Sequence, residues 1–208
     1  MTFAGALAST TPGGEIDCLD PGDFGAVTIT KALKIICGES RGSGEAGVQV
    51  SGTNGIVVSA GPNDVVVLEG LDIDGLGTGL NGVSVVSGKE IYILGSAIRN
   101  FSQNGVNMAS STPGGHAFIN DSFILFNAGG VNVQGTANIG SITSTQILSN
   151  RSFGVQANGA NNIVGIQTSV LNNSPTGISL LNGGMAVSFG PSNLVTGAGA
   201  FTSTIISK

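Results

Sequence analysis

The sequence has very few of the side chains on which binding and catalysis usually depend. Its 208 residues include no tryptophan, one tyrosine, one histidine and two cysteines, and only 9% of them are charged. Two cysteines exclude a four-cysteine metal site. No apolar run has the length of a membrane-spanning helix, so we expect no membrane insertion. Residues 1–11 lack a basic leader and are too short and too weakly apolar for a signal peptide.

Charge is scarce and unevenly placed along the chain. The net charge is −5, and eleven of the twelve acidic residues lie before residue 91. After Asp121 the only charged side chains are Arg151 and Lys208. A nucleic-acid-binding protein needs a cationic track that displaces counterions, and none is present. We therefore do not expect a nucleic-acid partner.

Glycine, in contrast, is abundant, with 35 residues, and it recurs in front of an apolar residue. The recurring pairs are Gly55-Ile56, Gly82-Val83, Gly105-Val106, Gly130-Val131, Gly154-Val155 and Gly177-Ile178. Successive pairs are about 24 residues apart, and a period of this size is typical of repeat proteins. In such proteins each unit buries its apolar face against its neighbours.

Each repeat contains three short runs of alternating apolar and polar residues, separated by turn residues, as residues 89–110 illustrate. No segment has helical periodicity long enough for a crossover helix. The pattern predicts a solenoid with three strands per coil and parallel sheets along the stack. Segments 42–44 and 75–79 are expected to be loops between coils.

Superposed coils separate an inward set of residues from an outward set. The inward positions of one strand are Val83 and Val85, Val106 and Met108, Val131 and Val133, Val155 and Ala157, and Ile178 and Leu180. The residues between them form an outward polar row, whose amides and hydroxyls can meet the hydroxyls of a glycan. This candidate ligand-binding row contains Ser84, Asn107, Asn132, Gln156 and Ser179.

Four asparagines end apolar triplets just before a turn: Asn100, Asn127, Asn150 and Asn173. Stacked coils place such side chains about 4.8 Å apart, so each amide can donate to the next. We predict a buried asparagine ladder; ordinary turn asparagines are the alternative.

Cys18 and Cys37 are separated by a little less than one repeat, so stacking can bring them together. We favour two small buried thiols. A disulfide is the alternative if the protein is exported.

The repeats resemble those of the pectin-lyase-like, right-handed parallel β-helix proteins over about residues 13–200. Segments 2–6 (TFAGA), 14–17 (GEID), 19–22 (LDPG) and 24–31 (FGAVTITK) resemble the leading coil of short bacterial members. The resemblance implies an all-β, single-stranded right-handed parallel β-helix of about seven coils. It forms one domain over 1–208, with a capping helix in 1–12, coils in 13–200 and a C-terminal strand or tail in 201–208. It also implies secretion, a periplasmic place or a cell-surface place for the full-length protein, and self-association through open coil ends.

The family's enzymes act on acidic polysaccharides, so the resemblance implies a polysaccharide partner. The sequence lacks the arginine and aspartate pattern of pectate lyases. Of the polygalacturonase motifs, only a partial match at Gly114-Gly115-His116-Ala117 is present. The motifs therefore do not support the family's enzyme activities.

Three side chains precede the same predicted strand in successive coils. Asp64, Glu90 and His116 follow one another at equal spacing, and we expect them to stack in one column that continues with Asn138 and Asn162. Two carboxylates about 5 Å apart match a retaining glycosidase pair, and with the histidine they can hold a divalent ion. The alternative is a set of strand-entry side chains that face water. No serine or cysteine shows a nearby histidine and acid of the kind used in nucleophilic catalysis.

Asp72 and Asp74 alternate with apolar residues and share one outward face, and Arg99 follows one coil later. An exposed Asp74–Arg99 ion pair is the first interpretation. The alternative is a base or ligand role, with Asp72 and Asp74 as weak candidates for a metal site.

Asp17, Asp20 and Asp23 surround Pro21-Gly22 and are interpreted as turn residues, for which calcium binding is the alternative. No other cofactor is expected.

Two classes of function follow. The first is a non-catalytic rod, or a weak carbohydrate-binding or surface-interaction module, which requires only the stack and its outward rows. The second is a polysaccharide lyase or glycoside hydrolase that uses Asp64, Glu90 and His116. We favour the first, because the predicted turns are too short to build the walls of a cleft.

Overall fold

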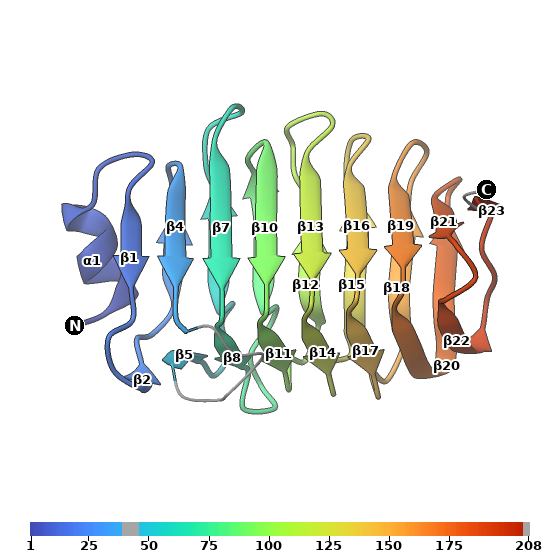
Figure 1. Cartoon of the computed structure of the whole chain (residues 1–208), viewed down its shortest axis with the longest axis horizontal. Helices are drawn as coiled ribbons and strands as arrows, with labels where there is room; N and C mark the ends of the chain where they lie inside the picture. The colour runs from blue at the N-terminus through green and yellow to red at the C-terminus, as the bar shows by residue number, and fades with distance from the viewer. Residues whose placement is uncertain (39–45, 206–208) are drawn as a thin grey trace.

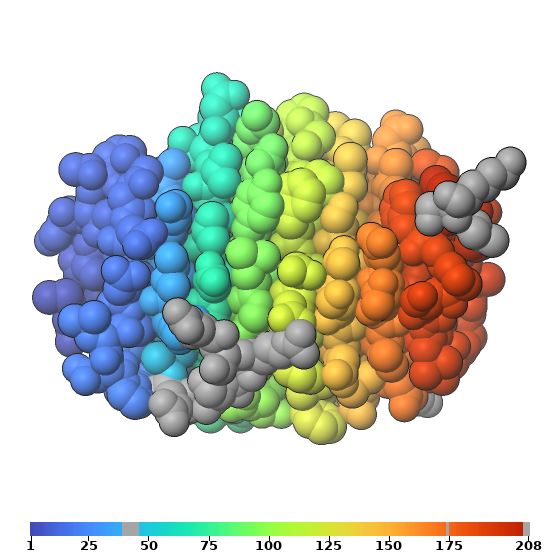
Figure 2. Space-filling model, viewed as in Figure 1, coloured from blue at the N-terminus to red at the C-terminus, as the bar shows by residue number. Residues whose placement is uncertain are grey.

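The computed structural model describes residues 1–38 and 46–205 and shows an all-β parallel solenoid of about seven turns with one short helix (Figure 1). Each coil contributes one strand to a nine-stranded sheet, here sheet A, and two strands to a 14-stranded sheet, here sheet B. The predicted loop at 42–44 and tail residues 206–208 lie outside the described residues. The coils follow one another as bands along the long axis (Figure 2). The architecture predicted from the repeats is confirmed.

Sheet A forms one long face of the solenoid. Its strands, in spatial order, are β1 (Glu15–Asp17), β4 (Leu33–Ile36), β7 (Val65–Glu69), β10 (Glu90–Leu94), β13 (His116–Asn120), β16 (Ile139–Thr143), β19 (Ile163–Gln167), β21 (Met185–Phe189) and β23 (Ser203–Ile205).

Sheet B has two arms that meet at the long strand β20 (Val170–Leu181). The first arm contains β2 (Gly22–Asp23), β5 (Ala46–Gln49), β8 (Asp72–Asp74), β11 (Ala97–Arg99), β14 (Phe123–Leu125) and β17 (Gln146–Leu148). The second arm contains β3 (Val27–Ile29), β6 (Ile56–Ser59), β9 (Val83–Ser87), β12 (Asn104–Met108), β15 (Gly129–Gln134) and β18 (Phe153–Asn158), while β22 (Leu194–Ala198) pairs with β20.

The inward register predicted from the repeats is confirmed. Val83 pairs with Val106, Val106 with Val131, Val131 with Val155, and Val155 with Ile178. All of these side chains are buried in one continuous core. Only the last inward position, Leu180, emerges to 37% exposure near the C-terminal end. Alternation with period two thus fixes which face of each strand meets the core.

The asparagine ladder forms from three of the four predicted residues. Asn127 donates from its backbone and its side chain to the Asn150 carbonyl oxygen, and Asn150 does the same to Asn173. All three are buried. Asn100 was predicted wrongly, because Phe101 occupies the ladder position in that coil and its N–H donates to Asn127 Oδ1 at 3.0 Å. Asn100 instead turns the backbone at φ 62° and donates to Asp74.

A second ladder, made of hydroxyl groups, follows the strands of sheet A and was not predicted. Its members are the buried side chains Ser96, Ser122, Thr145 and Ser169. Each hydroxyl donates to the carbonyl two residues earlier and accepts the backbone N–H of the preceding coil, beginning with Leu71 N–H on Ser96. Buried backbone groups at this turn thus find partners in the next coil.

The N-terminal end of the core is closed by helix α1 (Phe3–Ser9), as predicted. Thr2 caps the helix by accepting the Gly5 N–H at 3.2 Å. Phe3 is buried, and its ring centroid lies 5.0 Å from that of Phe24. At the other helix end, the Lys31 ammonium donates to the carbonyls of Leu7 and Thr10, which complements the helix dipole.

Cys18 and Cys37 form a disulfide, so the preferred interpretation of two free thiols is wrong. The two residues follow paired strands β1 and β4, and Cys18 N–H donates to the Ile36 carbonyl. This pairing places their Cα atoms 4.6 Å apart. The bond therefore fastens the first two coils together.

Candidate functional site

The predicted ligand-binding row lies in register but is less exposed than expected. Ser84 and Asn132 are buried, while Asn107, Gln156 and Ser179 are half-buried. Asn107 Oδ1 accepts from Asn132 at 3.0 Å, and Gln156 donates to Ser179 at 2.9 Å. Several of the polar groups that a glycan would need are thus already hydrogen-bonded to side chains on neighbouring strands. The ligand role of this row stays a prediction.

The predicted column of Asp64, Glu90 and His116 is only partly formed. Glu90 pairs directly with His116 across β10 and β13. On its other side Glu90 pairs with Val65, so Asp64 stands one position too early. The Asp64 carboxylate instead accepts the Gly61 N–H at 2.7 Å and closes its own turn.

The predicted continuation of this column through two asparagines is also wrong. His116 pairs with Ile139, which in turn pairs with Ile163. Asn138 and Asn162 lie one position earlier and are buried, and Asn138 N–H donates to Asn162 Oδ1 at 2.8 Å. They secure the turns before sheet A. The pair of stacked carboxylates expected for a glycosidase is therefore absent from the described register, whereas Glu90 and His116 are neighbours.

Around this pair, five side chains gather on the outer face of sheet A, here the sheet A site: Glu90, Tyr92, His116, Phe118 and Ser141. The Tyr92 and Phe118 rings stack with centroids 4.6 Å apart and planes 8° apart. His116 lies over Phe118 at 3.8 Å and 24°. Cross-strand pairing of Tyr92 with Phe118, and of Phe118 with Ser141, produces this arrangement.

Hydrogen bonds orient the polar members of the sheet A site. Tyr92 Oη donates to Glu90 Oε2 at 3.0 Å, and this bond is the main cause that raises the pKa of Tyr92. His116 Nε2 lies 2.7 Å from Ser141 Oγ. Burial lowers the pKa of His116, and the negative charge of Glu90 opposes this shift. The site therefore favours the uncharged imidazole, which lies beside the Ser141 hydroxyl.

A shallow depression adjoins the sheet A site on its C-terminal side. It has a volume of about 220 Å³, and its lining residues are Ser141, Ile142, Thr143, Gly165, Gln167 and Phe189. Gly165 is needed for its depth, because a Cβ there would lie 2.8 Å from the Phe189 ring. Small residues on two adjacent strands thus leave a hollow between the aromatic stack and Phe189.

Asp72 and Asp74 are held by Arg99. The guanidinium binds both carboxylate oxygens of Asp72, and its Nε donates to Asp74 Oδ2 at 3.0 Å. The predicted Asp74–Arg99 ion pair is confirmed, although the Asp74 and Arg99 side chains are only 13% and 29% exposed rather than fully solvated. Burial acts to lower the pKa of Arg99, but the two aspartates outweigh it and raise that pKa.

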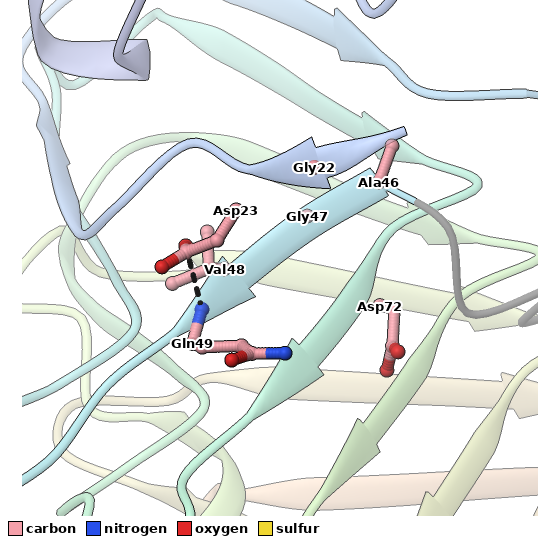
Figure 3. A pocket seen from close by; sticks show the side chains of 7 residues that line it. All are labelled: Gly22, Asp23, Ala46, Gly47, Val48, Gln49 and Asp72. Atoms are coloured by element: carbon pink, nitrogen blue, oxygen red, sulfur yellow. Dashed lines mark hydrogen bonds between the residues drawn. The ribbon is translucent and has the colours of Figure 1, made fainter. Parts of the chain in front are cut away.

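The cavity beside Asp72 is small, about 130 Å³, and also contains Asp23 and Gln49 in its wall (Figure 3). Asp23 Oδ1 accepts the backbone N–H groups of Gly25 and Gln49. In residues 1–38 and 46–205, no three His, Cys, Asp or Glu side chains are grouped to hold a metal ion. At Asp72 and Asp74 the guanidinium of Arg99 already occupies the position that a metal ion would need. The calcium hypothesis thus gains no support.

Sequence reasoning identified Glu90 and His116 but missed the other half of the site. Ser141 was not predicted, because the strand partner of His116 is Ile139. Ser141 lies two residues after Ile139 and contacts His116 diagonally across the two strands. The expectation that no serine lies near a histidine and an acid is wrong for this reason. A detectable signal was the step from Tyr92 to Phe118, which equals the step from Glu90 to His116 and so aligns the two rings.

No helix in the described part of the chain is long and apolar enough to cross a bilayer.

Comparison with models of known families, with characterised proteins and with solved structures finds no match to this chain.

Proposed function

We propose that the protein is a carbohydrate-binding solenoid and that the outer face of sheet A holds the glycan. The observation that carries this proposal is the parallel stack of Tyr92 and Phe118 on an open sheet face, beside Glu90 and Ser141. A sugar has C–H groups that pack against exposed aromatic surface, and hydroxyls that need polar partners. Aromatic surfaces with nearby donors and acceptors provide both.

The solenoid also offers a track for an extended chain. Strands of sheet A are spaced about 4.8 Å apart along the axis. A glycan that runs along this axis passes from the aromatic stack to Ser141 and then into the hollow over Gly165. The polar groups it meets there are Thr143 and Gln167. Binding of this kind needs no charged groove, in keeping with the low charge of this half of the chain.

The experiment is affinity electrophoresis through gels that contain xylan, polygalacturonate or another soluble polysaccharide. We expect retardation by at least one polymer, and a loss of about tenfold or more in affinity in Tyr92→Ala with Phe118→Ser. Phe126→Ala is the matched control, because Phe126 is an exposed phenylalanine on a turn after β14, away from sheet A. Equal retardation of the double variant and the control would contradict the proposal.

Polysaccharide cleavage is the second candidate, favoured by the direct pairing of Glu90 with His116. Cleavage and binding would act on the same class of substrate. The solenoid architecture also leads us to propose that the chain is related to the pectin-lyase-like proteins, a group that includes polysaccharide-cleaving enzymes. The test incubates acidic and neutral polysaccharides with and without calcium and follows reducing ends and unsaturated products. Turnover that is abolished by Glu90→Gln would support cleavage. Measurable binding without any cleavage of the polymer would support binding only.

An extracytoplasmic location is part of the proposal. The Cys18–Cys37 disulfide supports it, because such bonds persist in oxidising compartments. Recovery of the oxidised protein from the medium or periplasm of expressing cells tests it, and an exclusively reduced cytosolic form in the native cell would contradict it.

Self-association through the C-terminal end is also proposed. Strands β22 and β23 are the last described members of sheets B and A, and Phe189, Leu194 and Ile205 are 43–58% exposed there. No charged residue occurs between Arg151 and Lys208 to oppose edge pairing. Light scattering should show a concentration-dependent dimer that Leu194→Lys weakens and Leu19→Lys, at the opposite end, does not. A monomer at all concentrations would contradict it.

A further inference from the structure

The strongest unexplained contact on the surface of the solenoid joins a serine to the one histidine of the chain. Ser141 Oγ on β16 lies 2.7 Å from His116 Nε2 on β13. Stacking on Phe118 fixes the plane of the imidazole, so this contact does not depend on a freely rotating side chain. A hydroxyl at this distance can transfer its proton to a neutral imidazole nitrogen.

The neighbouring strand places a carboxylate beside the imidazole. Glu90 on β10 pairs directly with His116, on the side opposite to Ser141, and its charge favours the protonated imidazole. Tyr92 Oη holds the Glu90 carboxylate at 3.0 Å. An acid, a histidine and a serine thus follow one another across three adjacent strands. The negative charge of Glu90 favours the imidazolium that forms when the serine proton reaches His116.

Space for a substrate lies on the free side of the serine. The depression of about 220 Å³ begins at Ser141 and is closed by Phe189, with Gly165 as its floor. Its volume is large enough for a short acyl group. Thr143 and Gln167 line the same space and carry an O–H and an N–H₂ that can donate to an oxyanion.

We propose that Ser141 and His116 form a nucleophile and base that transfer a short acyl group from a carboxylic ester. Ser141 Oγ attacks the ester carbonyl carbon while its proton passes to His116 Nε2. The C–O bond to the alcohol then breaks, and the alkoxide leaves with that proton as the free alcohol. Water, deprotonated by His116, attacks the acyl-serine and releases the carboxylic acid, with Ser141 restored. No oxidant, metal or co-substrate other than water is required.

This activity rests on a different observation from glycan binding. Ester hydrolysis needs the contact between Ser141 Oγ and His116 Nε2, whereas glycan binding needs the exposed aromatic surface of Tyr92 and Phe118. A small ester carries no sugar, so the two proposals can fail separately.

The test uses the whole chain with p-nitrophenyl acetate and, separately, with a fluorophosphonate probe. We expect nitrophenolate release that falls by about 100-fold or more in Ser141→Ala and in His116→Phe. The fluorophosphonate adduct should map by mass spectrometry to the peptide that contains Ser141. Ser152→Ala, which removes an exposed serine on the turn before β18, is the matched control and should keep the full rate and the adduct.

Three outcomes would overturn the proposal. The first is hydrolysis that survives Ser141→Ala, because the imidazole of His116 would then react with the ester directly. The second is an adduct on another residue. The third is the absence of both hydrolysis and adduct while thermal melting shows the wild-type protein and the variants equally folded.

Discussion

The buried ladders and the sheet A site use similar residue types in opposite ways. In the asparagine ladder, Asn127, Asn150 and Asn173 satisfy one another and the backbone, and water does not reach them. In the sheet A site, Glu90 and His116 pair and His116 contacts Ser141, yet all three stay half-exposed on an open face. Polar groups whose bonds are all made inside the stack stabilise the fold. Polar groups that can still form hydrogen bonds are available to a ligand.

The comparison has a physical basis in the position of each row within the coil. The ladders occupy turns where backbone N–H groups point into the stack and require acceptors. The sheet A site lies within the strands, where backbone groups already pair with neighbouring strands. Side chains there are not needed as hydrogen-bond partners for the backbone. Substitutions in the two regions should therefore separate stability from binding.

The largest effect is expected for Asn150→Ala. The change leaves the Asn127 backbone and side-chain donors and the Ile124 carbonyl without their partner. Each buried unpaired group costs about 1–3 kcal/mol, so the loss in unfolding free energy should be about 3–5 kcal/mol after relaxation. Urea denaturation measures it, and Asn63→Ala on an exposed turn is the control. A loss below about 1 kcal/mol would remove the distinction between ladder and surface.

A smaller effect is expected for Ser122→Ala in the hydroxyl ladder. The variant loses the bond to the Asn120 carbonyl and leaves the Ser96 N–H without an acceptor. We expect a loss of about 1–2 kcal/mol in unfolding free energy with polysaccharide retention unchanged. Ser122→Thr should restore most of it, because Thr145 performs the same function one coil later. Failure of threonine to rescue would indicate packing rather than hydrogen bonding.

The pH dependence of the sheet A site should be modest and of known sign. The folded state lowers the pKa of His116, mainly by burial, so the unfolded chain binds this proton more tightly. Stability from this group is therefore present above the unfolded pKa of about 6.5 and is lost as pH falls through the folded value. Glu90 on β10 faces the imidazole with opposing charge, and Ser141 faces it from β16.

The measurement compares urea midpoints of the wild type and His116→Phe between about pH 5 and 7.5. The wild type should gain stability more steeply with pH than the variant. Parallel slopes would contradict the assignment, because the two proteins differ only in this imidazole.

The smallest change in stability is expected for Tyr92→Phe. Tyr92 is half-exposed, and its hydroxyl bonds only to Glu90 among the described contacts. We expect a change within about 0.5 kcal/mol in unfolding free energy, as for most surface substitutions. The ring stack on Phe118 persists, so polysaccharide affinity should fall less than in Tyr92→Ala. A Tyr92→Phe variant as weak as Tyr92→Ala would assign binding to the hydroxyl rather than the ring.

The repeat and the inward register could be predicted because apolar alternation leaves only one face for the core. Val106, Val131 and Val155 repeat in step with the strands, and a shift by one would expose the whole set. Polar residues near turns lack this constraint. Ala97 pairs with Phe123, but the step from Asn100 to Asn127 is one position longer, and this single position removes Asn100 from the ladder.

The same kind of error separated Asp64 from Glu90. The step from Asp64 to Glu90 equals the step from Glu90 to His116, but β7 and β10 pair with an offset that is one position shorter. Loop lengths vary from coil to coil, so residues with equal spacing in the sequence need not pair with one another across neighbouring strands. The disulfide and the Ser141 contact depend on side-chain directions after folding, which no repeat pattern encodes.

The direction of the hydroxyl ladder has a consequence for a chain that emerges from the ribosome. Leu71 N–H is accepted by Ser96, Ser96 N–H by Ser122, and so on to Thr145 and Ser169. Each acceptor is translated one coil after its donor. During synthesis, the most recently made coil therefore has a backbone N–H group without its acceptor. Synthesis of the next coil supplies the hydroxyl that accepts this hydrogen bond.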